Sequence, residues 1–202
     1  MTTTAISKHV LRLGVAAFLA VPVGASAQTL AFGALVGANL SPFTTYAESG
    51  FTVDLFSGTI CNAMIFGNPV PDLVGGPVCN GGSTASTLRI KRTAGGLFRF
   101  LNTDLATQSG SSTYTFAGFL ASVSQYSTTN SFTLSATFAN RAGPNPTTDI
   151  DELRISLNTT TASSYNIDNI ALSVSTVPEP SSVALMSAGL LGLLAVARRR
   201  KA

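Results

Sequence analysis

The stretch LRIKRTAGGLFRFL, residues 88–101, shows the period-two pattern that decides the fold class. Leucine and isoleucine alternate with basic residues before the turn, and two phenylalanines alternate with an arginine after it. Successive side chains of a β-strand point to opposite faces, so this alternation predicts two half-buried strands. A three-residue loop with Gly95 in the left-handed conformation keeps the apolar residues on one face of a hairpin. Arg89, Lys91 and Arg99 would then share the outer face.

These three cations allow two interpretations. Like charges opposite one another on a sheet are destabilising by a few tenths of a kcal/mol or more unless something neutralises them. A carboxylate of the domain would leave an ordinary solvated strand face, whereas an acidic polysaccharide would make Arg89, Lys91 and Arg99 an anion-binding patch.

The same alternation recurs along the chain, at residues 51–55, 132–138, 153–157 and 170–174, and no amphipathic helix interrupts it. Turns rich in Ser, Thr, Gly and Asn separate these segments. The pattern predicts an all-β fold, an antiparallel, jelly-roll-like β-sandwich. Residues 28–176 are long enough to form one such domain with a core of its own.

The only two cysteines, Cys61 and Cys79, frame a loop rich in Gly and Pro. In an oxidising compartment the spacing predicts a disulfide, and metal binding by two cysteines without histidine is the weaker alternative. Closing a loop of about 18 residues stabilises a fold by roughly 3 kcal/mol in the chain-entropy model.

Export signals flank this domain. Lys8 and Arg12 precede an apolar stretch at residues 13–23, and Ala25-Ser26-Ala27 supplies small residues for cleavage. This order predicts a signal peptide over residues 1–27 and a mature start near Gln28. A membrane-anchoring first helix is the alternative, but the apolar stretch is short for one.

The C-terminal segment has three parts. Pro178, Glu179 and Pro180 are followed by two serines and an uncharged apolar run at residues 183–197, and then by the basic residues Arg198, Arg199, Arg200 and Lys201. A helix over residues 181–197 would be apolar on every side and roughly 25 Å long, which is the short end of a membrane span. The basic residues would stay in the cytoplasm and the rest of the chain would lie outside.

In this order, residues 177–202 resemble the PEP-CTERM sorting tail of Gram-negative bacteria. The resemblance implies recognition of the Pro-Glu-Pro motif by a membrane-embedded exosortase, cleavage near it, and delivery of the domain to the cell surface or the extracellular matrix. A plain C-terminal anchor is the alternative. Two shorter motifs, residues 46–51 and 165–172, resemble the first and last strands of ectodomains that carry this tail and of carbohydrate-binding sandwiches.

Charge and residue content limit the chemistry. Between residues 28 and 176 eight carboxylates outnumber six basic side chains, so the slightly acidic domain shows no basic balance for binding nucleic acid. The single histidine, His9, lies in the predicted signal peptide, which excludes Ser-His-Asp and Cys-His catalysis in the mature domain. We therefore expect no enzyme and no cofactor.

The remaining acidic cluster is Asp149, Asp151 and Glu152. With Asp168, the two aspartates could hold a structural Ca²⁺ ion, although a solvated turn is the simpler interpretation and a glycosidase pair the least supported one. Tryptophan is absent, so a sugar platform would rely on Tyr46, Tyr114, Tyr126 or Tyr165.

Two functional classes remain. The first is a non-catalytic surface or matrix protein that associates with exopolysaccharide and touches the membrane only during sorting. The second is a carbohydrate-binding module with a defined glycan ligand.

Overall fold

A computed structural model describes residues 26–67, 69–79, 84–162, 164–175, 186–187 and 189–190. The described domain is all-β, and every strand pair in it is antiparallel. The strands are β1 (Ala27–Leu30), β2 (Thr45–Glu48), β3 (Phe51–Ser57), β4 (Ile60–Ala63), β5 (Asp72–Gly75), β6 (Ala85–Arg92), β7 (Phe98–Leu120), β8 (Val123–Ala142), β9 (Glu152–Thr159) and β10 (Tyr165–Val174).

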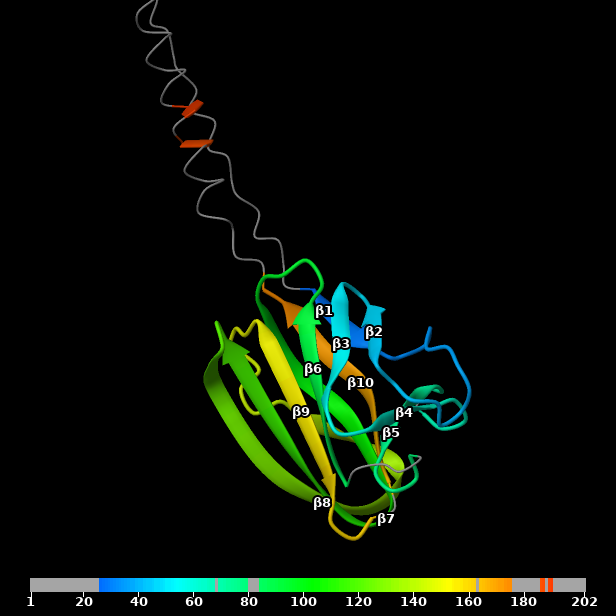
Figure 1. Cartoon of the computed structure of the whole chain (residues 1–202). Coiled ribbons are helices and arrows are strands. Elements are labelled where there is room, and N and C mark those ends of the chain that lie inside the picture. Colours follow the sequence, from blue (N-terminus) through cyan, green and yellow to red (C-terminus); the bar gives the residue numbers. More distant parts are fainter. Residues whose placement is uncertain are drawn as a thin grey trace, which may run out of the picture.

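One curled sheet makes both layers of the domain. Its order is β2-β3-β6-β9-β7-β10-β5-β4, with β1 on β10 and β8 on β7. Strand β7 is 23 residues long and pairs with β10 through its first half and with β9 through its second half. The β7–β8 hairpin therefore bends around the domain and belongs to both layers (Figure 1). We call the layer of β2, β3, β6 and β9 the front layer, and that of β10, β5, β4 and β1 the back layer.

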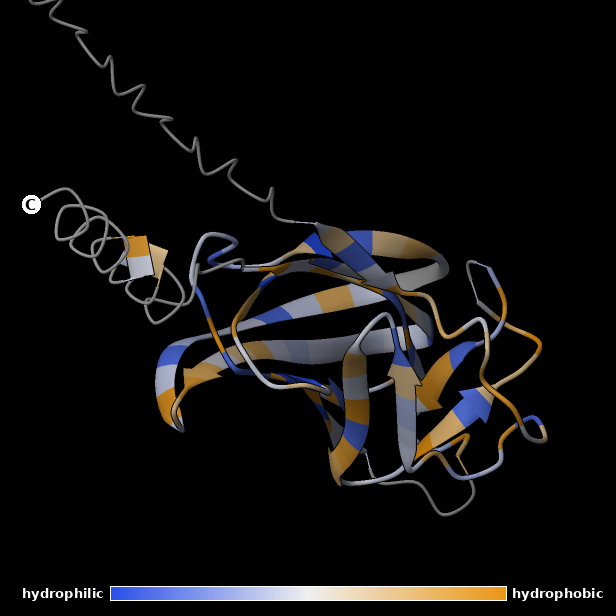
Figure 2. Cartoon of the chain, turned by 90° about the horizontal axis from the view of Figure 1, so that it is seen from above, coloured by the Kyte–Doolittle hydropathy of each residue, from blue (hydrophilic) through white to orange (hydrophobic). Residues whose placement is uncertain are grey.

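The core lies between these layers. Phe51 of β3 meets Phe98 of β7 edge-on at 5.2 Å, and Phe100 meets Phe116 at 4.8 Å between the two halves of β7. Such edge-to-face aromatic pairs stabilise a core beyond the area they bury. Apolar and polar residues alternate along the ribbons that enclose the core (Figure 2). The predicted all-β, antiparallel class is confirmed.

The hairpin predicted at residues 88–101 is wrong in its pairing. Strand β6 pairs with β3 and β9, and the turn that contains Gly95 carries the chain across to β7 instead of folding it back. The predicted faces are nevertheless right, because the apolar residues at positions 88, 90, 98 and 100 are all fully buried. Gly95 has the predicted left-handed conformation, with φ of +75°. Strands of opposite layers point their apolar faces into the same core, so alternation alone cannot identify partners.

Most of the two predicted targeting segments lies outside the described residues, including the Pro-Glu-Pro motif and the basic cluster. Ala27, the last residue of the predicted signal peptide, belongs to β1. Residues 186–187 and 189–190, within the predicted span at 181–197, are helical. In the parts of the chain that the structure describes, no helix has the length and apolar content needed to cross a bilayer.

Candidate functional site

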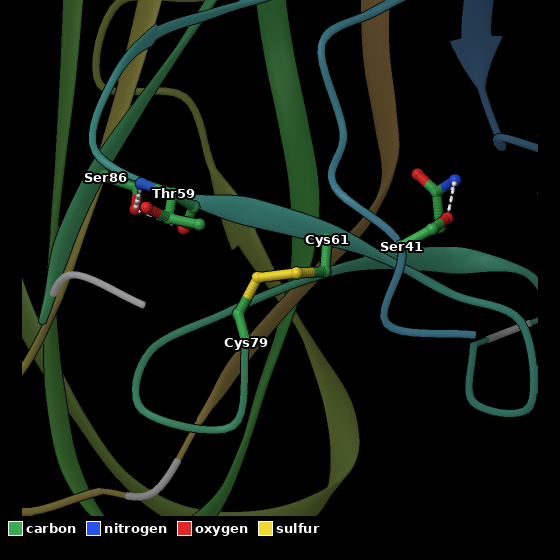
Figure 3. The surroundings of a disulfide bond; sticks show 6 residues. Ser41, Thr59, Cys61, Cys79 and Ser86 are labelled. Carbon is green, nitrogen blue, oxygen red and sulfur yellow. Dashed lines mark hydrogen bonds between the residues drawn. A yellow bond between two sulfur atoms is a disulfide. The ribbon is translucent and has the colours of Figure 1, made fainter. Parts of the chain in front are cut away.

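The predicted disulfide is present and joins Cys61 of β4 to Cys79 in the loop after β5 (Figure 3). Both cysteines are buried, and they pack with Ala63 and Val74 in a small apolar cluster of their own. Nearby, the Ser86 hydroxyl donates a hydrogen bond to the Thr59 carbonyl at 2.7 Å and accepts one from its N–H at 3.0 Å. This region fixes the edge of the back layer and serves the fold.

The predicted cations do not form one patch. Arg89 and Lys91 lie on the outer face of the front layer, whereas Arg99 lies on β7 where it pairs with β10 in the back layer. There Arg99 Nε is 2.7 Å from Asp149 Oδ1, and the hydrogen bond from Arg99 lowers the pKa of Asp149 while the Asp149 hydrogen bond raises that of Arg99.

Carboxylates of the domain neutralise the other two cations, Arg89 and Lys91. Arg89 lies 3.0 Å from Asp54 of β3, and Lys91 lies 2.7 Å from Glu152 of β9. Glu152 also accepts a hydrogen bond from Arg154 at 2.6 Å. These five residues form one outward-facing group. We call this group, together with Phe56 and Phe119, the charged face.

The electrostatics of this face centre on Glu152, whose side chain is only 10% exposed. Burial alone would raise the pKa of Glu152, but the hydrogen bonds and charges of Lys91 and Arg154 outweigh it and lower that pKa. The carboxylate therefore stays ionised at neutral pH and holds both cations in place.

Two phenylalanines of the charged face lie against Arg154. The Arg154 guanidinium lies 4.2 Å from the Phe56 ring centroid and 4.4 Å from that of Phe119. Arg89 also approaches Phe56, at 5.6 Å. Phe56 is 45% exposed, so an aromatic surface remains open to solvent beside the stacked guanidinium.

A polar pocket of about 300 Å³ continues the charged face at one end of the domain. Its lining comes from the β6–β7 turn, the β7–β8 turn and the start of β9, with the residues Lys91, Arg92, Gly95, Gly96, Ala121, Ser122, Asp151 and Glu152. Ala121 and Ser122 both have positive φ, as a two-residue hairpin turn requires. The Ala121 N–H donates to Asp151 Oδ2 at 2.8 Å, so Asp151 holds this turn. The pocket offers donors and acceptors together.

The three aspartates considered for calcium have separate surroundings in the fold. Asp149 pairs with Arg99 and Asp151 binds the Ala121 N–H, whereas Asp168 is fully buried in β10. Across the described ranges, no three His, Cys, Asp or Glu side chains approach closely enough to hold a metal ion.

The Asp168-Asn169 pair shapes β10 from within the strand. Asn169 has φ of +47° at an irregularity in the β10–β7 register. Its N–H donates to Asp168 Oδ1 at 2.7 Å, and its side-chain amide donates to Asp104 of β7 at 3.0 Å. These bonds fix a bulge in the back layer.

The aromatic residues of the charged face are phenylalanines, whereas the sequence analysis considered only tyrosines as a sugar platform. Tyr165 is fully buried and Tyr114 and Tyr126 are 8% exposed, so all three belong to the core. Phe56 and Phe119 instead occupy outward positions of their strands. An aromatic residue on the polar side of an alternating strand was the available signal.

A second pocket, of about 290 Å³, lies beside the disulfide and is mainly apolar. Leu40, Ile65, Phe66 and Val78 line it, with Asn166 of β10 at its polar side. Of these residues, Ile65 is 80% exposed.

The fold and the face define an all-β sandwich domain with a polar outer surface. Residues 176–201 match the PEP-CTERM protein-sorting motif, as the sequence predicted. This motif marks an exosortase-sorted surface protein of the Gram-negative type.

Several solved structures resemble the chain at low sequence identity. A DUF4465 family protein from Bacteroides caccae is 11% identical with a TM-score of 0.49, covering 74% of this chain and 100% of its own. A family 29 carbohydrate binding module from Piromyces equi is 12% identical with a TM-score of 0.44, covering 76% and 93%. A family 11 carbohydrate-binding module from Clostridium thermocellum is 10% identical with a TM-score of 0.37, covering 67% and 96%. No curated protein sequence matches the chain.

Proposed function

We propose that this protein is a non-catalytic component of the cell surface or extracellular matrix that associates with exopolysaccharide. The observation that carries the proposal is the match of residues 176–201 to the sorting motif. Exosortase recognises the Pro-Glu-Pro segment, the tail holds the chain at the inner membrane during sorting, and cleavage releases the sandwich to the outside. The disulfide Cys61–Cys79 suits that oxidising destination.

Mass spectrometry of the protein recovered from the matrix tests this proposal. We expect an N-terminus near Gln28, a C-terminus near Pro180, and a mass that includes the disulfide. A tailless variant that ends at Thr176 should no longer be retained at the cell or matrix by the sorting route. Matrix protein that keeps the basic residues 198–201 would refute exosortase processing.

The charged face supports a second, more specific function, that of a carbohydrate-binding module. Phe56 remains 45% exposed beside Arg154 and offers aromatic surface against which a sugar ring can pack. Rows of hydroxyls adjoin it, with Thr87 2.9 Å from Ser156 and Thr115 2.7 Å from Thr129. The polar pocket at the opposite end of the charged face, at about 300 Å³, lies at the lower end of the usual range for ligand sites.

Affinity electrophoresis in gels that contain the exopolysaccharide of the producing cells tests this second function. Phe56→Ala should weaken retardation several-fold, because the exposed ring supplies the platform. Ile65→Ala is the matched control, since Ile65 is also an exposed apolar side chain but lies beside the disulfide. Equal retardation of wild type and Phe56→Ala would exclude the charged face as the glycan site and leave the matrix role intact.

A further inference from the structure

The long strand β8 is an open edge of the sheet. It pairs with β7 along one side, and none of the other described strands pairs with its other side. In Figure 1 it forms the outermost curved ribbon on the left of the domain. The other edges are short or covered, since β2 and β4 have four residues each and residues 40–43 bond along β4.

Between Tyr126 and Thr133, strand β8 lacks the features that keep natural edge strands from pairing with other chains. Proteins usually protect an edge by charged residues, proline, bulges or short length. Residues 123–140 include no charged residue and no proline, and β8 is 20 residues long. The register with β7 is unbroken from Tyr126 to Thr133. This segment therefore presents a regular, neutral template of backbone donors and acceptors.

The sequence of this segment is close to a palindrome. Residues 126–132 read YSTTNSF and are centred on Thr129. If two copies pair antiparallel about a two-fold axis at Thr129, Tyr126 lies opposite Phe132 and Ser127 lies opposite Ser131. Every opposing pair then has the same parity, so core-facing residues meet core-facing residues.

Burial agrees with that pairing. Tyr126 is 8% exposed and Phe132 is 4% exposed, so both point into the core. Ser127, Thr129 and Ser131 are exposed on the outer face. Two copies would thus place aromatic side chains beside aromatic side chains and hydroxyls beside hydroxyls, which are favourable cross-strand pairs.

We propose that β8 is a self-association surface on which a second copy of this chain adds through antiparallel pairing of residues 126–132. The self-complementary sequence selects an identical partner, because a two-fold interface uses the same patch on both subunits. The hydroxyl row of Ser156, Thr115 and Thr129 continues across the axis into the partner. Both charged faces lie on the same side of the joined sheet.

Cysteine cross-linking of the exported full-length chain tests the partner and the register together. Thr129→Cys lies on the axis and should give a disulfide-linked dimer on a non-reducing gel. Ser127→Cys alone should stay monomeric, because its partner position is Ser131, whereas co-expressed Ser127→Cys and Ser131→Cys chains should cross-link. The native cysteines do not interfere, since both are in the disulfide Cys61–Cys79.

A charge at the axis supplies an independent measurement. Thr129→Lys places two ammonium groups opposite each other and should halve the sedimenting mass of the full-length protein in detergent. Thr113→Lys adds the same charge on the interior strand β7 and should leave the dimer unchanged. A Thr129→Cys chain that stays monomeric, or a Ser127→Cys chain that cross-links equally well, would overturn the proposal.

Discussion

Replacing Asp72 by Asn should stabilise this protein at neutral pH. Asp72 begins β5 and is fully buried. Its Oδ2 accepts one hydrogen bond, from the Asn166 amide at 2.9 Å, and none of the ion pairs among the described residues includes it. Burial, with a smaller contribution from the neighbouring charge of Asp168, raises the pKa of Asp72 to about 9, although the hydrogen bond from Asn166 acts to lower it. The folded protein therefore keeps this carboxyl protonated at pH 7.

The sign of the pH dependence follows from proton linkage. Below the ordinary pKa of 3.8, folded and unfolded chains both carry the proton, and Asp72 has no effect on the pH dependence. Between 3.8 and about 9 only the folded chain keeps it, so the free energy of unfolding falls as the pH rises. At about 1.4 kcal/mol per pH unit, the free energy of unfolding falls by at most about 4 kcal/mol between the ordinary pKa and pH 7.

An asparagine at this position keeps the shape of the protonated carboxyl and does not titrate. We expect Asp72→Asn to match the wild type near pH 4 and to exceed it by up to about 4 kcal/mol at pH 7. Urea unfolding of both full-length chains at several pH values between 4 and 8 measures this difference. Asp54→Asn, which breaks the half-exposed ion pair with Arg89, is the control and should lose no more than about 1 kcal/mol. An Asp72→Asn chain that is less stable than the wild type at pH 7 would refute the reasoning.

Three further changes test other parts of the domain. Replacing Cys61 and Cys79 by Ala should lower the free energy of unfolding by roughly 3 kcal/mol and abolish the effect of reductant, measured by urea unfolding with and without dithiothreitol. Glu152→Gln removes the carboxylate between Lys91 and Arg154 and should lower the free energy of unfolding by about 1 kcal/mol at pH 7. Because the folded pKa of Glu152 is lowered, this difference should disappear as the pH falls from about 4.5 through that folded pKa. An unchanged difference at low pH would contradict the ion-pair account. Gly75→Ala would overlap the ring of the fully buried Tyr165 and should lower the thermal midpoint by the equivalent of about 1–3 kcal/mol, whereas Gly50→Ala meets no neighbouring atom and isolates the cost of a positive φ.

Alternation in the sequence identified strands and faces but could not identify partners. Leu88 and Phe98 are buried as predicted, yet Leu88 lies in the front layer and Phe98 on the half of β7 that pairs with β10 in the back layer. The actual partner of β6 on one side is β9, where Leu88 pairs with Ile155 far along the chain. Pairing at that distance depends on how the whole chain closes its core, which a local pattern does not encode.

The candidate site could be predicted only in part, again because alternation does not identify strand partners. The sequence singled out Arg89 and Lys91 and named a carboxylate of the domain as one way to neutralise them. It could not name Asp54 or Glu152, because these carboxylates reach Arg89 and Lys91 only once β3 and β9 pair with β6. The stacking of Arg154 against Phe119 likewise exists only once β9 and β7 pair.

The place of β10 in the sheet has a mechanical consequence. The sorting tail follows β10 directly in the sequence, and β10 has β7 along one side with β1 and β5 along the other. A pull on the tail acts along this strand and loads the hydrogen bonds of both ladders in shear, all at the same time. Peeling would need a strand at the edge, where the bonds break one after another. While the tail is still attached, the domain therefore resists a pull toward the membrane without unravelling at its point of attachment.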